Sequence, residues 1–273
     1  MRGAGGRGSP AGQQSGVQHS LEQLDAKVLV SETFVSLQGE GKLTGVPSWF
    51  CRLSGCNLRC AWCDTPYASW APEGEMRTLG SLVDEARASG VRHAVLTGGE
   101  PMIFKQLPAL CARLREAGLH ITIETAGTVY PEPWQAIGGT RPLACDLMSL
   151  SPKLANSTPT GDPRDPSGAW ADRHESKRLD PEALARLIDD HPDRQLKFVI
   201  TSADDLAEIE TLVEGVRTRL TTALAPSDVM LMPEGVRVPE PREIAWVVEA
   251  CVERGWRFCP RVQIQLFGDT RGT

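Results

Sequence analysis

Short apolar runs recur along the chain from about residue 27 onward, and several of them are continuous rather than alternating. Continuous apolar runs of this length are typical of strands that are buried on both faces, as in a parallel sheet. We expect strands over residues 49–53, 94–97, 121–124, 143–150, 196–200, 229–232 and 262–267.

Segments with apolar residues at helical spacing lie between these runs. We expect helices over residues 104–114, 206–220 and 244–251, each with one apolar face. A further helix should begin at Pro181, because Asp180 directly before it is a favourable N-cap. Strands that alternate with helices predict crossover connections, and therefore a parallel sheet or partial barrel.

Length and local composition predict the domain organisation. The chain has 273 residues, and we expect one α/β core domain over residues 27–273. Residues 1–26 are rich in Gly, Ser and Gln and predict a flexible N-terminal extension. Residues 156–178 contain three prolines and little apolar periodicity. We expect a surface insertion there, a lid or, by preference, a disordered loop.

Charge and hydropathy exclude some classes of partner. Acidic residues outnumber basic ones by 35 to 29, which argues against a broad basic face for nucleic acid. A small anionic substrate in a locally basic pocket stays possible. No apolar run approaches a membrane span, and the N-terminal residues lack the apolar segment of a signal peptide. We therefore expect a cytoplasmic protein without a membrane partner.

Four of the eight cysteines lie between residues 51 and 63, which favours a metal or cluster site over disulfides. Cys56, Cys60 and Cys63 have gaps of three and two residues, and thiolates are the ligands of iron–sulfur clusters. Three ligands leave one iron of a 4Fe–4S cluster open to a chelating molecule. Zinc is the alternative, with Cys51 as a fourth ligand. Cys51 lies in an apolar run, however, where a buried core residue is the more common role.

The cysteine spacing resembles the signature of the radical S-adenosylmethionine (SAM) superfamily. In that superfamily the open iron binds SAM, and an electron from the cluster cleaves it to start radical chemistry. The run Thr97-Gly98-Gly99-Glu100 ends an expected strand and resembles the site that binds the SAM amino group. The other cysteines, at positions 111, 145, 251 and 259, fit buried core positions.

A closer resemblance extends from about residue 28 to the end of the chain and is densest over residues 34–101. The segments 34–41, 50–52, 55–58 and 62–68 are similar to those of the 7-carboxy-7-deazaguanine synthase family. Neither the N-terminal extension nor the 156–178 insertion is covered. The resemblance implies a single-domain, reduced TIM-like barrel of the radical SAM type. It also implies conversion of 6-carboxy-5,6,7,8-tetrahydropterin to 7-carboxy-7-deazaguanine with release of ammonia, in queuosine biosynthesis.

The resemblance further implies a set of cofactors, partners and site residues. The cofactors would be a 4Fe–4S cluster, SAM and Mg²⁺, with Thr65 as the protein ligand of Mg²⁺. Partners would be a flavodoxin-like electron donor and a second copy of the chain. Expected substrate-binding residues are Leu37, Gln38, Gly39, Arg52 and Thr97. Expected SAM-binding residues are Gly99, Glu124, Ser151, Pro152, Lys153, Met232, Pro233, Glu234 and Gly235.

Several of these residue types suit their implied roles. The Gln38 amide can donate and accept at the edge of a pterin, and the Arg52 guanidinium can bind a carboxylate in a bidentate fork. Lys153 can pair with the SAM carboxylate. Residues 263–273 are expected to close over the substrate.

Two other functions remain open from the sequence. One is an activating enzyme for a glycyl-radical partner, and the other is a non-catalytic iron–sulfur or zinc protein. The Gln38–Gly41 turn, Arg52 and Thr65 favour the synthase, because a protein-modifying enzyme has no clear use for them.

Overall fold

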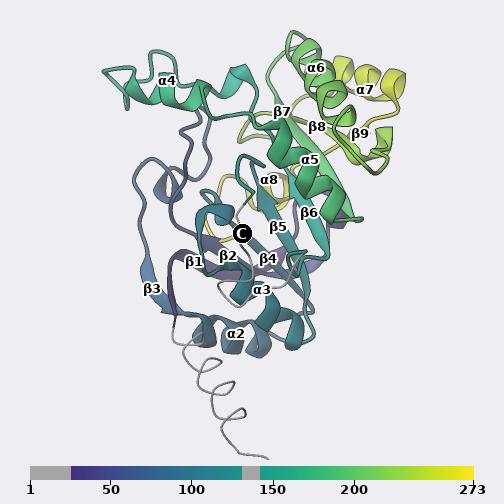
Figure 1. The fold of residues 1–273 in the computed structure, drawn as a ribbon. Coiled ribbons are helices and arrows are strands. Elements are labelled where there is room, and N and C mark those ends of the chain that lie inside the picture. Colours follow the sequence, from purple (N-terminus) through teal and green to yellow (C-terminus); the bar gives the residue numbers. More distant parts are fainter. Residues whose placement is uncertain (1–25, 131–141) are drawn as a thin grey trace, which may run out of the picture.

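A nine-stranded sheet runs through the described part of the chain, which comprises residues 26–130 and 142–273 of this computed structural model (Figure 1). Its strands are β1 (Lys27–Leu37), β2 (Pro47–Leu53), β3 (Glu75–Thr78), β4 (His93–Gly98), β5 (His120–Thr125), β6 (Leu147–Leu150), β7 (Arg194–Ile200), β8 (Val229–Pro233) and β9 (Arg257–Phe258). Residues 1–25 of the expected N-terminal extension lie outside the described residues.

The strand order is β3-β1-β2-β4-β5-β6-β7-β8-β9. Neighbouring strands from β2 to β9 are parallel, whereas β1 is antiparallel to both β2 and β3. The edge strands β3 and β9 do not pair with each other, so the sheet stays open. This arrangement confirms the predicted partial barrel.

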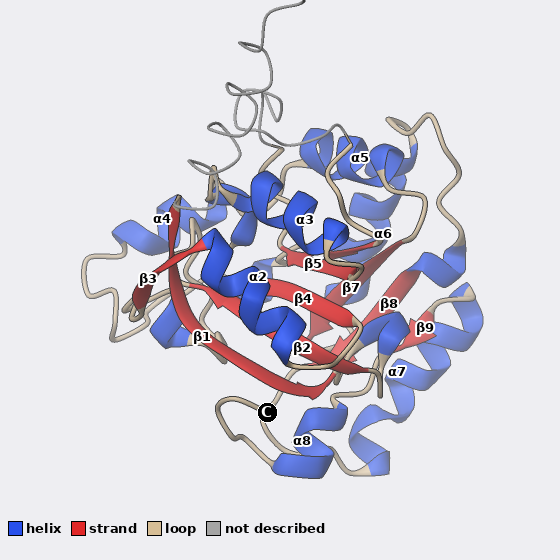
Figure 2. Cartoon of the chain, turned by 90° about the horizontal axis from the view of Figure 1, so that it is seen from below, coloured by secondary structure: helices blue, strands red, loops and turns tan. Residues whose placement is uncertain are grey.

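The helices are α2 (Leu79–Ala88), α3 (Leu107–Glu116), α4 (Ala169–Glu175), α5 (Pro181–Asp190), α6 (Asp205–Arg217), α7 (Pro241–Arg254) and α8 (Val262–Phe267). As predicted, Asp180 caps α5, accepting a hydrogen bond from the Ala183 N–H at 2.9 Å. Helices α2 and α3 lie on one side of the sheet and α8 on the other (Figure 2). No helix in the two described ranges is long and apolar enough to cross a bilayer.

Side chains alternate between the two faces of the strands. On β7, for example, Leu196, Phe198 and Ile200 join the main core beneath the helices. Lys197 and Val199, which alternate with them, face the inside of the open barrel and line a cavity. The same alternation sends Cys51 of β2 into the main core. The sheet therefore has an apolar outer face and a mixed inner face that forms the site.

Three sequence predictions differ from the structure. Residues 262–267 form the helix α8 rather than a strand, and of its apolar side chains only Ile264 is buried. The strand expected over residues 143–150 is limited to β6, because the Cys145 N–H donates to the Leu143 carbonyl in a turn. The segment 156–178 is not a disordered loop, since it contains α4 and many hydrogen bonds.

Candidate active site

A cavity of about 520 Å³ occupies the inner face of the sheet. Its wall includes Phe50 and Arg52 of β2, Thr97 of β4, Glu124 of β5 and Lys197 of β7. These residues lie on four of the strands from β2 to β7 in the strand order and point inward because of the strand alternation described above. The cavity therefore extends across the inner face of the sheet from β2 to β7.

The cysteine loop, residues 54–63, follows the carboxyl end of β2. Cys56, Cys60 and Cys63 are free thiols, and all three line the cavity. Burial raises the pKa of Cys56 and of Cys60 to about 12, so a positively charged metal centre is needed to hold them as thiolates at neutral pH. Cys51 faces the opposite side of β2, so it is a core residue. The three remaining thiols are a donor set that fits an iron–sulfur cluster with one open iron.

The segments after β4 and β6 lie next to the cysteine loop. Gly99 lines the cavity, and a Cβ atom there would lie 2.3 Å from the Gly55 carbonyl oxygen and 2.5 Å from that of Ala68. Gly99 is therefore required for the close approach of the cysteine loop, a role the sequence did not indicate. Ser151 and Lys153 also line the cavity, and the Lys153 ammonium donates to the Ser151 hydroxyl at 2.9 Å.

Several expected SAM-binding residues do not form part of the cavity wall. Of the segment 232–235, only Met232 lines the cavity, and Pro152 does not line it. Glu100, next to Gly99, is also absent from the cavity wall and is fully buried. Its carboxylate accepts hydrogen bonds from the Met102 N–H, the Thr125 hydroxyl and the Ala126 N–H at 2.6–2.9 Å. Glu100 thus joins the ends of β4 and β5.

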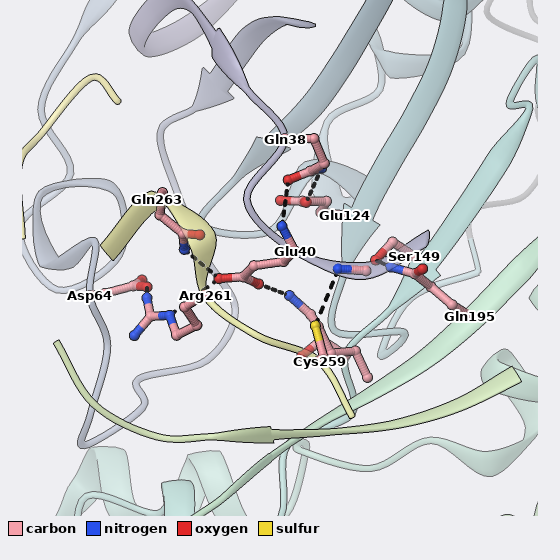
Figure 3. Close-up of polar contacts among 12 residues, drawn as sticks. Gln38, Glu40, Asp64, Glu124, Ser149, Gln195, Cys259, Arg261 and Gln263 are labelled. Carbon is pink, nitrogen blue, oxygen red and sulfur yellow. Dashed lines mark hydrogen bonds and ion pairs between the residues drawn. The ribbon is translucent and has the colours of Figure 1, made fainter. Parts of the chain in front are cut away.

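Gln38 and Glu124 meet inside the cavity. The Gln38 side-chain amide donates to the Glu124 carboxylate at 3.0 Å (Figure 3). Leu37, the last residue of β1, pairs with Pro47 at the start of β2. The Leu37–Gly39 segment therefore enters the cavity near the amino end of β2, whereas the cysteine loop follows its carboxyl end.

A buried ion-pair network that the sequence analysis missed lies beside Gln38. The Glu40 carboxylate binds the Lys197 ammonium, the Arg261 guanidinium at 3.3 Å and the Gln263 amide at 2.7 Å (Figure 3). Arg261 also binds Asp64 at 2.6 Å. Burial alone would raise the pKa of Glu40, but the charges of Lys197 and Arg261 outweigh it and lower the pKa to about 2. A lysine inside the apolar run 196–200 is the signal that could have revealed this network.

Arg52 occupies a second ionic cluster. Its Nε donates to Glu32 at 2.7 Å, while its Nη nitrogens make no hydrogen bond with the described residues. Glu32 also accepts from the Tyr67 hydroxyl at 2.9 Å and pairs with Arg271 at 3.1 Å. Arg271 stacks over the Tyr67 ring at 3.8 Å. These contacts hold residues 268–273 in the cavity wall, together with Gln263 and Ile264.

Thr65 lies in the cavity wall beside Cys63. It is the N-cap of a short 3₁₀ helix, Pro66–Ala68, but its side chain makes no capping hydrogen bond there. Its hydroxyl oxygen is 3.8 Å from the Cys63 sulfur. The hydroxyl is thus not used for capping, which is the ordinary role of a threonine at such a position.

Known proteins similar to this chain identify its family. The radical SAM superfamily profile matches residues 52–176. The 7-carboxy-7-deazaguanine synthase of Rhodopirellula baltica is 47% identical over 251 residues, which cover 91% of this chain and 90% of that protein. The chain belongs to the 7-carboxy-7-deazaguanine synthase family. The synthase of Halobacterium salinarum is 42% identical over 89% of this chain and 92% of its own length.

The crystal structure of QueE from Escherichia coli covers 88% of this chain and 96% of its own, with a TM-score of 0.61 at 24% identity. This likeness shows the shared fold. Membership in the synthase family makes the chain a radical SAM enzyme with a 4Fe–4S cluster and SAM as cofactors. The two alternative functions left open by the sequence are not favoured.

Proposed function

We propose that this enzyme converts 6-carboxy-5,6,7,8-tetrahydropterin to 7-carboxy-7-deazaguanine with release of ammonia. The observation that carries the proposal is one continuous cavity with two chemically different ends. The three cysteines, Gly99 and Lys153 lie at one end, while Gln38 enters from the turn after β1 and meets Glu124 of β5. Such a cavity can hold a cofactor and a small heterocycle side by side.

The substrate end suits a flat, carboxylated ring. Phe34 and Phe50 stack at 4.8 Å between ring centroids, and both rings line the cavity. The free Nη edge of Arg52 can receive the substrate carboxylate while Nε stays bound to Glu32. The charge already present on Arg52 thus favours an anionic ligand beside an apolar wall.

The ring edge of the substrate needs both donors and acceptors. Glu124 offers a carboxylate and Gln38 an amide to that edge. The buried Oε1 of Gln263 has no hydrogen-bond partner among the described residues, although its Nε2 binds Glu40. Because that oxygen is out of contact with solvent, Gln263 supports Glu40 and leaves the ring edge to Gln38 and Glu124.

At the other end, Cys56, Cys60 and Cys63 are the proposed cluster ligands. When bound, the cluster and SAM supply the hydrogen-atom abstraction that no side chain can provide. Lys153 would hold the SAM carboxylate, and its hydrogen bond to Ser151 would orient the ammonium. Thr65 has a hydroxyl available as a hard oxygen ligand for Mg²⁺, with substrate and water completing the shell. A flavodoxin-like donor and a homodimer remain expectations from the family resemblance, and a cytoplasmic location remains an expectation from the hydropathy of the sequence.

The decisive test is anaerobic turnover. The protein is reconstituted with iron and sulfide, then supplied with a reductant, SAM, Mg²⁺ and carboxytetrahydropterin. We expect the deazaguanine product by mass, with ammonia in equal amount, and no product from the Cys60→Ala variant. Cleavage of SAM to 5′-deoxyadenosine without the deazaguanine would refute the proposed substrate while keeping the radical SAM assignment.

A further inference from the structure

The segment 156–178 extends from the end of the sheet toward the cysteine loop, and its helix α4 stands apart from the helices that cover the sheet (Figure 1). We propose that this segment is a brace that holds the cysteine loop in its cluster-binding shape, with His174 as the positioning residue. The inference rests on the cluster ligands proposed above and adds a role for residues that contact neither SAM nor substrate.

His174 is the central contact of the brace. Its side chain is fully buried, and its Nδ1 accepts a hydrogen bond from the Arg59 backbone N–H at 3.1 Å. A backbone N–H can only donate, so Nδ1 carries no proton and the ring proton lies on Nε2. Nε2 is 2.9 Å from the Ser157 hydroxyl, which donates in turn to the Leu154 carbonyl at 2.6 Å. Both ring nitrogens are therefore hydrogen-bonded, and the imidazole is held in one orientation.

The brace binds the cysteine loop at two further backbone groups. The Ala61 N–H donates to the Ser157 carbonyl at 2.8 Å, and the Ala61 carbonyl accepts from Arg164 at 2.7 Å. The neighbouring Trp62 indole donates to the Asn156 carbonyl at 3.1 Å. Three positions around Cys60, namely Arg59, Ala61 and Trp62, are thus bound by residues about one hundred positions later in the chain.

Two cation–π contacts between arginine and tryptophan side chains also pack against the cysteine loop. The Arg59 guanidinium stacks over Trp170 of α4 at 4.0 Å and donates to the Cys56 and Leu58 carbonyls. Arg164 stacks over Trp70 at 4.2 Å, and the Trp70 indole donates to the Cys60 carbonyl at 3.0 Å. Cation–π contacts of this kind add to the backbone hydrogen bonds in holding the loop.

The physical need for such a brace follows from the loop itself. Residues 57–62 form no strand or helix, so their N–H and C=O groups have no regular partners. Cluster ligands must nevertheless be held in a fixed geometry before the cluster binds. Removing the acceptor at His174 leaves the Arg59 N–H buried without a partner, which favours an open loop in which that N–H meets water.

The test measures how tightly the loop keeps its cluster. His174→Leu removes the acceptor at similar size, whereas His174→Asn places an amide oxygen near the Nδ1 position. His191→Leu is the matched control, because His191 is also buried but follows α5, far along the chain from the cysteine loop. Each anaerobically reconstituted variant is mixed with an iron chelator, and iron release is followed by absorbance. The electron paramagnetic resonance spectrum of the reduced cluster with SAM is recorded in parallel.

We expect His174→Leu to release iron at least about fivefold faster than the parent protein and to broaden the cluster spectrum. His174→Asn should restore most of the parent rate, and His191→Leu should release iron at the parent rate. Equal rates for His174→Leu and the parent, or an equal acceleration in both leucine variants, would overturn the proposal.

A second variant covers the case in which His174→Leu does not fold. Arg164→Ala removes a partly exposed side chain and its contact with the Ala61 carbonyl, so folding should be retained. Faster iron release from this variant supports the brace, and an unchanged rate refutes it. Failure of the parent protein to assemble any cluster would instead refute the proposed ligands.

Discussion

The side-chain amide of Gln38 donates to the Glu124 carboxylate at 3.0 Å, which links the turn after the antiparallel strand β1 to the parallel strand β5. The Gln38 Oε1 atom accepts from the Glu40 N–H at 3.3 Å. These two contacts fix which end of the amide is the donor, since a carboxylate accepts and an N–H donates. Gln38 is thus oriented before any ligand arrives.

Glu124→Gln should weaken substrate binding through this pair. The variant keeps the shape but removes the charge that strengthens the hydrogen bond to Gln38 and, by our proposal, to the substrate. Loss of a charge-assisted hydrogen bond is worth about 1.5–3 kcal/mol, so KM for the pterin should rise roughly tenfold or more. Steady-state kinetics measure this, with Glu116→Gln on the exposed side of α3 as control. An unchanged KM would remove Glu124 from substrate binding.

Arg52→Lys should distinguish fork geometry from charge alone. Lysine keeps the positive charge beside Glu32 but cannot bind both Glu32 and a carboxylate in the planar manner of a guanidinium. We expect substrate affinity, measured by equilibrium binding without SAM, to fall by about 1.5–3 kcal/mol in Arg52→Lys and further in Arg52→Gln. Retention of full affinity by the lysine variant would show that charge suffices.

Glu40→Gln should destabilise the fold strongly. The variant leaves Lys197 buried without its counter-charge, and breaking a buried pair in this way costs about 3–5 kcal/mol of unfolding free energy. Denaturant unfolding measures the loss. Glu243→Gln is the control, because Glu243 also has a pKa lowered to about 2 but lies on the surface with Arg237. The control should change stability little.

The same pair predicts a direction of pH dependence. The pKa of Glu40 falls from 4.5 to about 2 in the folded protein, so its contribution to stability is present above pH 4.5. That contribution should disappear as the pH falls toward about 2. The difference in unfolding free energy between parent and Glu40→Gln should therefore shrink over this range. A constant difference would contradict the assigned charge state.

Arg271→Ala should weaken substrate binding without lowering the stability of the fold. Its side chain is 46% exposed, so its ion pairs contribute less than about 1 kcal/mol to stability. It nevertheless joins residues 268–273 to Glu32 and to the Tyr67 ring at the cavity wall. We expect a nearly unchanged melting temperature and a raised KM, with Arg237→Ala as a surface control. A lower melting temperature with unchanged KM would assign Arg271 a purely structural role.

The sequence predicted the parts of this protein that depend on local spacing. The cysteine gaps, the helices α3, α5, α6 and α7 and most parallel strands follow from short-range patterns. Strand β1 was missed because Ser31, Glu32 and Thr33 interrupt its apolar residues. Residues 262–267 were wrongly predicted as a strand, because alternating Val262, Gln263 and Ile264 imitate the strand period in a short helix.

The missed site contacts depend on the tertiary arrangement. Glu40 and Lys197 are 157 positions apart, and only the curled sheet brings them together. The polar composition of residues 156–178 suggested disorder, but the polar groups of Ser157 and His174 are used against the cysteine loop. Composition alone does not reveal whether a polar side chain faces water or another loop.

The two edges of the open sheet meet through loops instead of a paired ladder. The Val262 N–H donates to the Gly39 carbonyl at 3.0 Å, and the Gly41 N–H donates to the Cys259 sulfur at 3.2 Å. A fully closed barrel is joined at this point by a continuous row of strand hydrogen bonds, whereas here the two edges are joined by these loop hydrogen bonds and by the contacts of Glu40 with Arg261 and Gln263. The barrel is thus joined at this point by side chains and loop backbone, and the hydrogen bonds between β1 and β2 do not depend on that junction.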